Sequence, residues 1–86
     1  MSEAETTTDH SRIRNWIDDR DGRPAKVSAG GTGGILRIDF GEPEEGLTPI
    51  AWEEFFEIFE KNQLAFLHQD RTADGQISRF SKFIDR

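Results

Sequence analysis

Two histidines and several serines are the residues of this chain that most readily suggest chemistry. Two imidazoles with nearby carboxylates can bind a metal ion, but His10 and His68 lack the HxH or HxxxH spacing of a local metal motif. A nucleophilic serine needs a strained turn and a positioned base, and Ser28, Ser78 and Ser81 lie in no GxSxG motif. We therefore assign no catalytic residue, no metal ligand and no cofactor.

A glycine-rich run, AGGTGG at residues 29–34, is the next candidate for ligand binding. A phosphate-binding loop of the Walker type ends in GK[ST] and continues directly into a helix. Here the strand-like segment ILRIDF follows instead. We interpret the run as the turn of a hairpin.

Charge is segregated along the chain, whose net charge is −6. Residues 41–60 hold seven Glu and no Lys or Arg, whereas residues 61–86 hold five basic and three acidic residues. The overall balance disfavours broad phosphate-backbone binding, which needs a basic surface. Segregated charge suits docking to a protein. The candidate partner-binding residues are Glu53, Glu57, Glu60, Arg37, Arg79 and Lys82.

The first half of the chain predicts one helix and one hairpin. Thr8 or Asp9 can cap a helix over about residues 9–20, which ends before Gly22 and Pro24. Residues 24–29 and 34–40 then form two strands, and the second alternates clearly between two faces. Residues 41–49 are predicted to be a loop.

The second half predicts the same order again. A helix over about 50–62 follows Thr48-Pro49, and a hairpin with Asp74-Gly75 at its tip comes after it. That turn places Phe66 opposite Phe83 and Asp70 opposite Arg79. A short helix over 77–84 is the alternative, because Ile77, Phe80 and Ile84 also fit a helical period.

These elements predict an α+β domain of order α-β-β-α-β-β. We expect a four-stranded, mostly antiparallel sheet with both helices packed on one face, a disordered tail at residues 1–8 and a single domain at 9–86. Trp16 and Trp52 could stack on a sugar or a base, but both lie on predicted buried stripes. The expected core is Ile13, Trp16, Ile17, Val27, Leu36, Ile38, Phe40, Trp52, Phe55, Phe56, Phe59, Leu64, Phe66, Phe80, Phe83 and Ile84.

Several segments together resemble a family of short, uncharacterised bacterial proteins, many of which carry the label "1,4-alpha-glucan branching enzyme". The segments are DHSRIRNWIDDRDGRPAKV, GGILRIDFG, IAWEEFFEIFE, LAFLHQD and SRFSKFIDR, and the resemblance covers residues 8–86. Similar sequences often have Ser where this chain has Ala51, and that Ser would form a capping box with Glu54. The label implies a glucan-related role. A branching enzyme resembles the amylase barrels, which need about 250 residues and two opposed carboxylates, so we carry over no catalytic residue.

The sequence thus favours a non-enzymatic interaction module that binds a protein partner or a second copy of itself. The absence of cysteine, of an apolar run long enough to span a membrane and of a signal-peptide pattern favours the cytoplasm. Nucleic-acid binding through the basic patches is one alternative. A glucan-related accessory role, implied by the resemblance, is the other.

Overall fold

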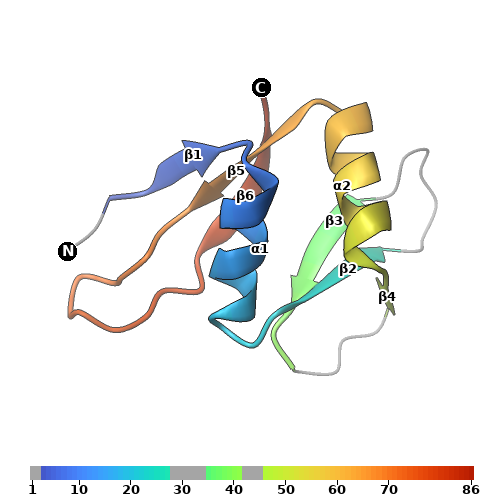
Figure 1. The fold of residues 1–86 in the computed structure, drawn as a ribbon. Coiled ribbons are helices and arrows are strands. Elements are labelled where there is room, and N and C mark those ends of the chain that lie inside the picture. The colour runs from blue at the N-terminus through green and yellow to red at the C-terminus, as the bar shows by residue number, and fades with distance from the viewer. Residues whose placement is uncertain (1–2, 28–34, 42–45) are drawn as a thin grey trace.

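The computed structural model describes residues 3–27, 35–41 and 46–86. The predicted glycine turn at 29–34, and Ser28 before it, lie outside these ranges. Within these ranges two helices and six strands are formed (Figure 1), which confirms the α+β class. In chain order they are β1 (Glu5–Thr7), α1 (His10–Asp18), β2 (Arg23–Val27), β3 (Ile35–Asp39), β4 (Leu47–Pro49), α2 (Trp52–Lys61), β5 (Leu64–His68) and β6 (Ser81–Asp85).

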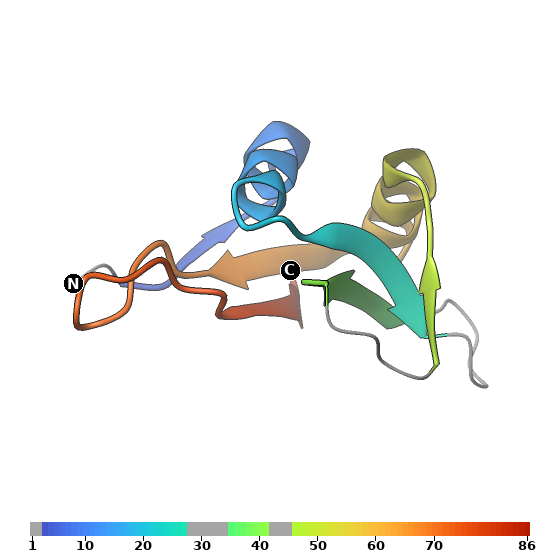
Figure 2. The same cartoon turned by 90° about the horizontal axis from the view of Figure 1, so that it is seen from below.

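The strands form two antiparallel sheets rather than the single four-stranded sheet that was predicted. Their strand orders are β1-β5-β6 and β3-β2-β4. Both helices lie on the same side of the strands, as Figure 2 shows. Each predicted hairpin gains a third strand, and β3 and β6, one from each sheet, are left as edge strands.

The two strands that the sequence analysis missed are both short. Residues 1–8 were expected to be disordered, but Glu5–Thr7 forms β1 and pairs with β5 from His68 to Phe66. Threonines favour extended backbone because their side chains branch at Cβ. Leu47–Pro49 was expected to be loop and instead pairs with β2. Three-residue strands carry too little alternation to be recognised from a sequence.

The second hairpin has the predicted register at its base and another turn at its tip. Phe66 lies opposite Phe83, as predicted, so the alternative helix over 77–84 is wrong. The Gly75 N–H donates to the Thr72 carbonyl, and Gly75 has a φ of +84°. A turn of this kind, followed by a left-handed glycine, replaces the predicted two-residue turn.

Near that tip the strands shift by one residue, and the predicted contact between Asp70 and Arg79 is lost. Arg71 pairs with Ile77, one residue out of the register that joins Phe66 and Phe83. Asp70 approaches Arg20 instead, at 3.9 Å, and Arg79 lies over the Phe40 ring.

The two helices begin differently. Asp9 caps α1 as predicted, because its carboxylate accepts the backbone N–H groups of Ser11 and Arg12 at 2.9 and 3.2 Å. Ala51 occupies the same position at α2 and offers no side-chain acceptor. Both helices are shorter than predicted.

We predict that Ala51→Ser stabilises the protein by about 1 kcal/mol. Ala51 already has the extended backbone of a capping residue (φ −74°, ψ 157°), so a serine Oγ could accept a helix N–H without rearrangement. Urea denaturation followed by circular dichroism measures the change. Ala73→Ser, at an exposed alanine in the hairpin turn, is the control and should leave the midpoint unchanged. Equal midpoints for both variants would contradict the prediction.

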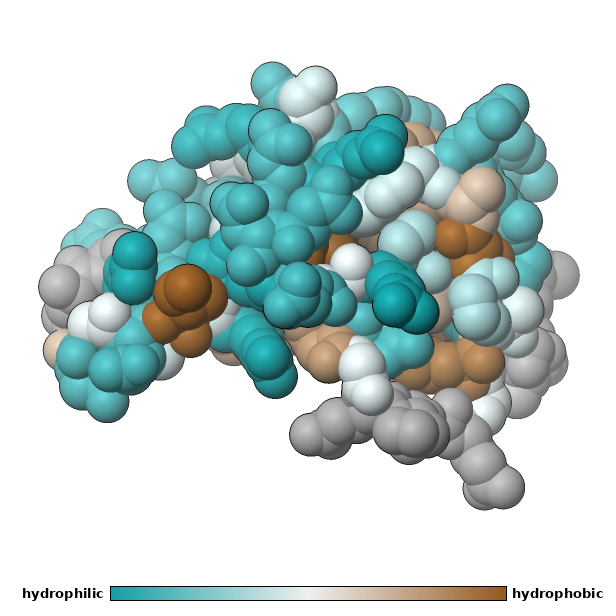
Figure 3. All heavy atoms as spheres, turned by 60° about the horizontal axis from the view of Figure 1, so that its bottom comes forward, coloured by the Kyte–Doolittle hydropathy of each residue, from teal (hydrophilic) through white to brown (hydrophobic). Residues whose placement is uncertain are grey.

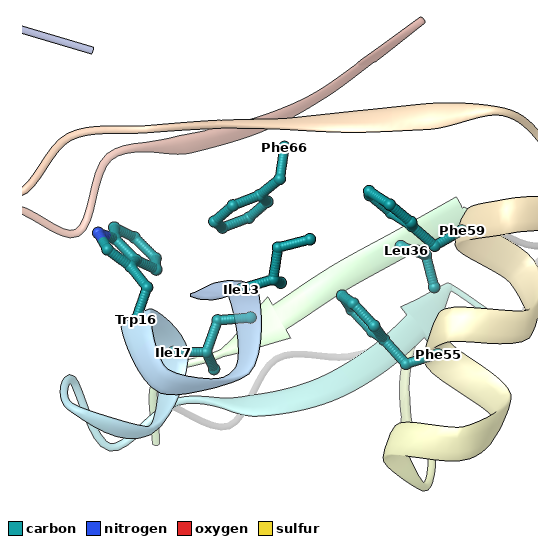
Figure 4. Packing of buried hydrophobic residues seen from close by; sticks show 7 residues of the cluster. All are labelled: Ile13, Trp16, Ile17, Leu36, Phe55, Phe59 and Phe66. Carbon is teal, nitrogen blue, oxygen red and sulfur yellow. The ribbon is translucent and has the colours of Figure 1, made fainter. Parts of the chain in front are cut away.

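The core lies between the helices and the strands, and its centre is aromatic (Figure 4). Most of the predicted core residues are buried or half-buried, but Phe80 is 49% exposed, so its assignment to the core is wrong. Phe80 pairs with Gln69 in the register of β5 and β6, and it is three residues from Phe83, so its side chain points to the opposite face of the strand. Ile77 is exposed on the same hairpin, which carries a brown patch at the left of Figure 3. The fully or nearly buried cluster is Ile13, Trp16, Ile17, Leu36, Phe55, Phe59 and Phe66.

A glycine at the end of α1 allows β2 and β3 to approach the helix. A Cβ on Gly22 would lie 2.8 Å from Ile17 Cγ2 and 3.0 Å from Ile38 Cγ2. The left-handed conformation belongs to the residue before it, since Asp21 has a φ of +57°. Gly22 is therefore required because a side chain would clash with its neighbours, and not because of its backbone angles.

Within the described ranges, no helix has the length and apolar character needed to cross a membrane.

Candidate partner-binding groove

Two of the four edge strands in the described sheets, β3 and β6, border the groove that we consider the candidate binding site. Its volume is about 740 Å³. The floor is apolar and continuous with the core, since Leu36 is buried and Phe83 packs against Phe55, Phe59 and Phe66. The apolar lining residues are Leu36, Ile38, Phe40, Leu64 and Phe83. We call this site the β3–β6 groove.

Three of the six predicted partner-binding residues line this groove. Arg37 comes from β3, Lys82 from β6, and Arg79 from the segment just before β6. All three side chains are exposed. Two parts of the chain that are about 40 residues apart in the sequence thus place their cations around one hollow.

These cations have few partners within the protein. Arg79 places its guanidinium 5.4 Å from the centre of the Phe40 ring, and Arg37 Nη1 donates to the Leu36 carbonyl at 3.1 Å. None of the three forms an ion pair with a residue that the structure describes. Asp85 is the one carboxylate in the described lining. The groove therefore carries an excess of positive charge in a chain whose net charge is −6.

The predicted acidic residues of α2 lie elsewhere and do not form one surface. Glu53 and Glu57 line a separate, smaller hollow together with Lys61. In that hollow Glu54 is neutralised by Lys26, whose Nζ lies 2.6 Å from Glu54 Oε2. The hollow therefore combines both signs of charge and has less to offer a basic partner than the sequence suggested.

Glu60 is occupied within the protein. Its Oε2 lies 2.7 Å from His10 Nε2 and 2.7 Å from Arg86 Nη2, and Arg86 Nε also donates to the Leu64 carbonyl. The carboxylate thereby joins the start of α1, the end of α2 and the end of β6. These contacts give Glu60 a role in stabilising the fold.

The Glu60 contacts predict a pH-dependent contribution to stability. Hydrogen bonds from His10 and then from Arg86 lower the pKa of Glu60 in the folded protein. A lowered carboxyl pKa stabilises the fold above the unfolded value, about 4.3, and this contribution is lost as the pH falls through the folded value. Glu60→Gln should therefore lower the urea midpoint at pH 7, and the deficit should shrink below about pH 4. A deficit that stays constant from pH 7 to pH 3.5 would contradict this.

The histidines and tryptophans are placed for packing. His10 stacks on Phe56 with ring centres 4.1 Å apart, and His68 is buried against Phe66 and Trp16. Trp16 is 6% exposed, and Trp52 is half-buried against Phe55 and Phe56. In the described ranges no three His, Asp or Glu side chains gather into a metal-binding group.

The groove itself was not foreseen, although its cations were. Leu36, Phe40 and Phe83 were assigned to the core, and they also line the groove because none of the described strands lies between β3 and β6. The sequence carried no signal that β3 and β6 would stay unpaired, and the predicted four-stranded sheet has no gap in this place. Comparisons with protein-family models, with curated proteins and with solved structures find no match to this chain.

Proposed function

We propose that this protein is a non-enzymatic interaction module, and that its β3–β6 groove binds an acidic segment of a partner protein. The observation that carries the proposal is the convergence of Arg37, Arg79 and Lys82 on an apolar floor, where Asp85 is the one carboxylate in the described lining and forms an ion pair with none of them. Carboxylates of the partner would pair with the cations, and apolar side chains would cover the floor. The absence of cysteine supports a cytoplasmic setting for this binding.

A peptide suits the groove better than a nucleic acid does. Phosphate-backbone binding gains its free energy from several neutralised phosphates and a basic surface. Here three cations share the groove with Asp85, and the remaining surface carries excess negative charge. The half-buried Leu64 and Phe83 in the lining offer an apolar contact that a phosphate backbone does not use.

The proposal is tested with a fluorescein-labelled hexapeptide of alternating Glu and Val residues, followed by fluorescence anisotropy. We expect saturable binding that weakens as salt is raised. Exchanging both Arg37 and Lys82 for Glu should lower the affinity at least about tenfold, which corresponds to about 1.4 kcal/mol. The matched control exchanges Arg14 and Lys61, which lie outside the groove, for Glu and changes the net charge equally. It should lower the affinity by less than about threefold.

Three outcomes would overturn the proposal. They are the absence of binding at millimolar peptide, equal losses of affinity in the two double variants, and binding of a thymidine oligonucleotide in preference to the peptide. The last outcome would assign the groove to nucleic acid. Circular dichroism of each variant confirms that the fold is retained.

A further inference from the structure

The lining of the β3–β6 groove includes a run of three consecutive residues from each of its two strands. Successive side chains of a strand point to opposite faces, so a pocket that lies over one face of a sheet touches alternate residues. This groove touches Leu36, Arg37 and Ile38 on β3, and it touches Ser81, Lys82 and Phe83 on β6. It therefore runs along the edges of both strands, where main-chain groups point, and not over a face.

The hydrogen bonds at the two ends of the β5–β6 ladder show which main-chain groups of β6 point into the groove. The Gln69 N–H donates to the Phe80 carbonyl, and the Arg86 N–H donates to the Gln63 carbonyl, both in the register of the ladder. Hydrogen-bonded pairs alternate along an antiparallel ladder. Lys82 and Ile84 therefore bond to β5.

It follows that Ser81, Phe83 and Asp85 direct their N–H and C=O groups away from β5. All three residues line the groove. Outside the β5–β6 ladder, their backbone N–H groups donate to no described residue. The edge of β6 thus offers unpaired main-chain groups at three alternate residues.

The edge of β3 faces the same groove in the same way. The Ile50 N–H donates to the Pro24 carbonyl, which directs the main chain of Pro24 toward β4 and that of its neighbours toward β3. By the same alternation Leu36 and Ile38 present their main-chain groups to the groove. The hydrogen bond from Arg37 Nη1 to the Leu36 carbonyl is consistent with this, since that carbonyl has no strand partner there. Arg37 already covers part of this edge, so β6 is the more open of the two.

From these edges we infer that the partner segment binds as an added β-strand paired with β6, an inference that rests on the proposed function. A strand in this position presents alternate side chains to the two sides of the layer. One set would cover Leu36 and Phe83, and the other would face Arg37 and Lys82, which are exposed. The structure therefore assigns to the site an extended segment in which aliphatic and acidic residues alternate.

A second copy of this chain is a poorer occupant than an acidic segment. Pairing β6 with β6 of another molecule would bring two copies of Lys82 close together, and lysine on an edge strand opposes such pairing. A segment with carboxylates at alternate positions converts the same lysine into an attractive partner. The positive charge of Lys82 therefore favours an acidic segment over a second copy of this chain at the edge of β6.

Amide hydrogen exchange followed by NMR tests the inference. The measurement uses the same hexapeptide of alternating Glu and Val residues, without the fluorescein label. In the free protein the N–H groups of Ser81, Phe83 and Asp85 should exchange faster than those of Lys82 and Ile84, which β5 protects. Saturation with peptide should slow exchange at Phe83 at least about tenfold and leave Lys82 within about twofold.

Peptides methylated on alternate main-chain nitrogens provide a second measurement. Methylation removes donors along one edge of the peptide and leaves its charge unchanged. Two patterns are possible, with methyl groups on the odd or on the even residues of the peptide. The pattern that removes the N–H donors facing β6 should weaken binding at least about tenfold.

The outcomes separate this inference from the proposed function. Binding that depends on Arg37 and Lys82, but neither protects Phe83 nor responds to either methylation pattern, overturns strand addition and leaves the acidic-segment proposal standing. Failure of the peptide to bind overturns both. Protection at Ser81, Phe83 and Asp85 with loss of binding in one methylation pattern supports strand addition. Dimerisation that slows exchange at Phe83 without peptide would assign the edge to a second copy.

Discussion

Replacing Phe66 with alanine is expected to lower the free energy of unfolding by about 3–5 kcal/mol, the usual cost of removing a buried phenyl group. Phe66 is fully buried on β5, and its ring lies 5.3 Å from Trp16 and 5.4 Å from Phe83. It therefore joins α1 to the second hairpin (Figure 4). In a domain whose total stability is about 5–15 kcal/mol, this loss is large enough to populate the unfolded state. Urea denaturation monitored by tryptophan fluorescence measures it.

Phe80→Ala is the matched control, because it removes the same phenyl group from a residue that is 49% exposed. Its effect should stay within about 0.5–1 kcal/mol. If Phe66→Ala fails to fold, Phe66→Leu retains most of the volume and should cost less than about 2 kcal/mol. Equal losses for Phe66→Ala and Phe80→Ala would show that the core is not centred on Phe66.

Periodicity sufficed to predict the long elements of this fold and the pairing of the second hairpin. The stripe of Ile13, Trp16 and Ile17 fixed the buried side of α1, and the pairing of Phe66 with Phe83 was predicted from the turn position. These predictions succeeded because large apolar residues at regular spacing have one favourable way to be buried.

The two short strands are determined by pairing with distant parts of the chain and not by their local sequence. Glu5–Thr7 is extended because β5 offers an edge beside it, and Leu47–Pro49 because β2 does. Neither segment carries a pattern of its own long enough to predict a strand. The groove depends on a further tertiary feature, namely that β3 and β6 do not pair with each other. The cations were predicted by type, whereas their convergence depends on the gap between the sheets.

The groove and the core have a common origin in that gap. A layer of strands under two helices would ordinarily be continuous, and its apolar face would be fully covered. Here Leu36 remains buried while Ile38, Phe40 and Phe83 are only half-buried, because β3 and β6 do not pair. The Trp16–Phe40 and Phe66–Phe83 ring contacts place the groove floor directly against the core. A ligand in the groove would therefore also raise the stability of the domain, which thermal denaturation can record.

A buried arginine holds the second hairpin against α1. Arg20 is 8% exposed and donates Nε to the Ser78 carbonyl at 2.5 Å, Nη1 to the Trp16 carbonyl at 2.9 Å and Nη2 to the Asp70 carbonyl at 3.0 Å. Its guanidinium also lies 4.0 Å from the centre of the Trp16 ring. Burial lowers the pKa of Arg20, and the carboxylate of Asp70 opposes that effect, so the side chain stays charged at neutral pH. One planar group with several donors thus satisfies three carbonyls from two parts of the chain.

Arg20→Met is therefore expected to cost about 2–4 kcal/mol, because it preserves much of the apolar contact and removes the donors of three carbonyls. Arg20→Lys should be intermediate in stability, since one ammonium cannot reach all three acceptors in the same geometry. Arg14→Met is the control, because Arg14 lies on the exposed side of α1 and its ion pair with Asp18, at 3.7 Å, contributes little to stability.

Amide hydrogen exchange measures the local effect of the same substitution. The Ser78 N–H donates to the Asp70 carbonyl. Its exchange rate should rise from the wild type to Arg20→Met by a larger factor than the exchange rates of the β5 amides. Unchanged Ser78 exchange would show that the hairpin is held without Arg20.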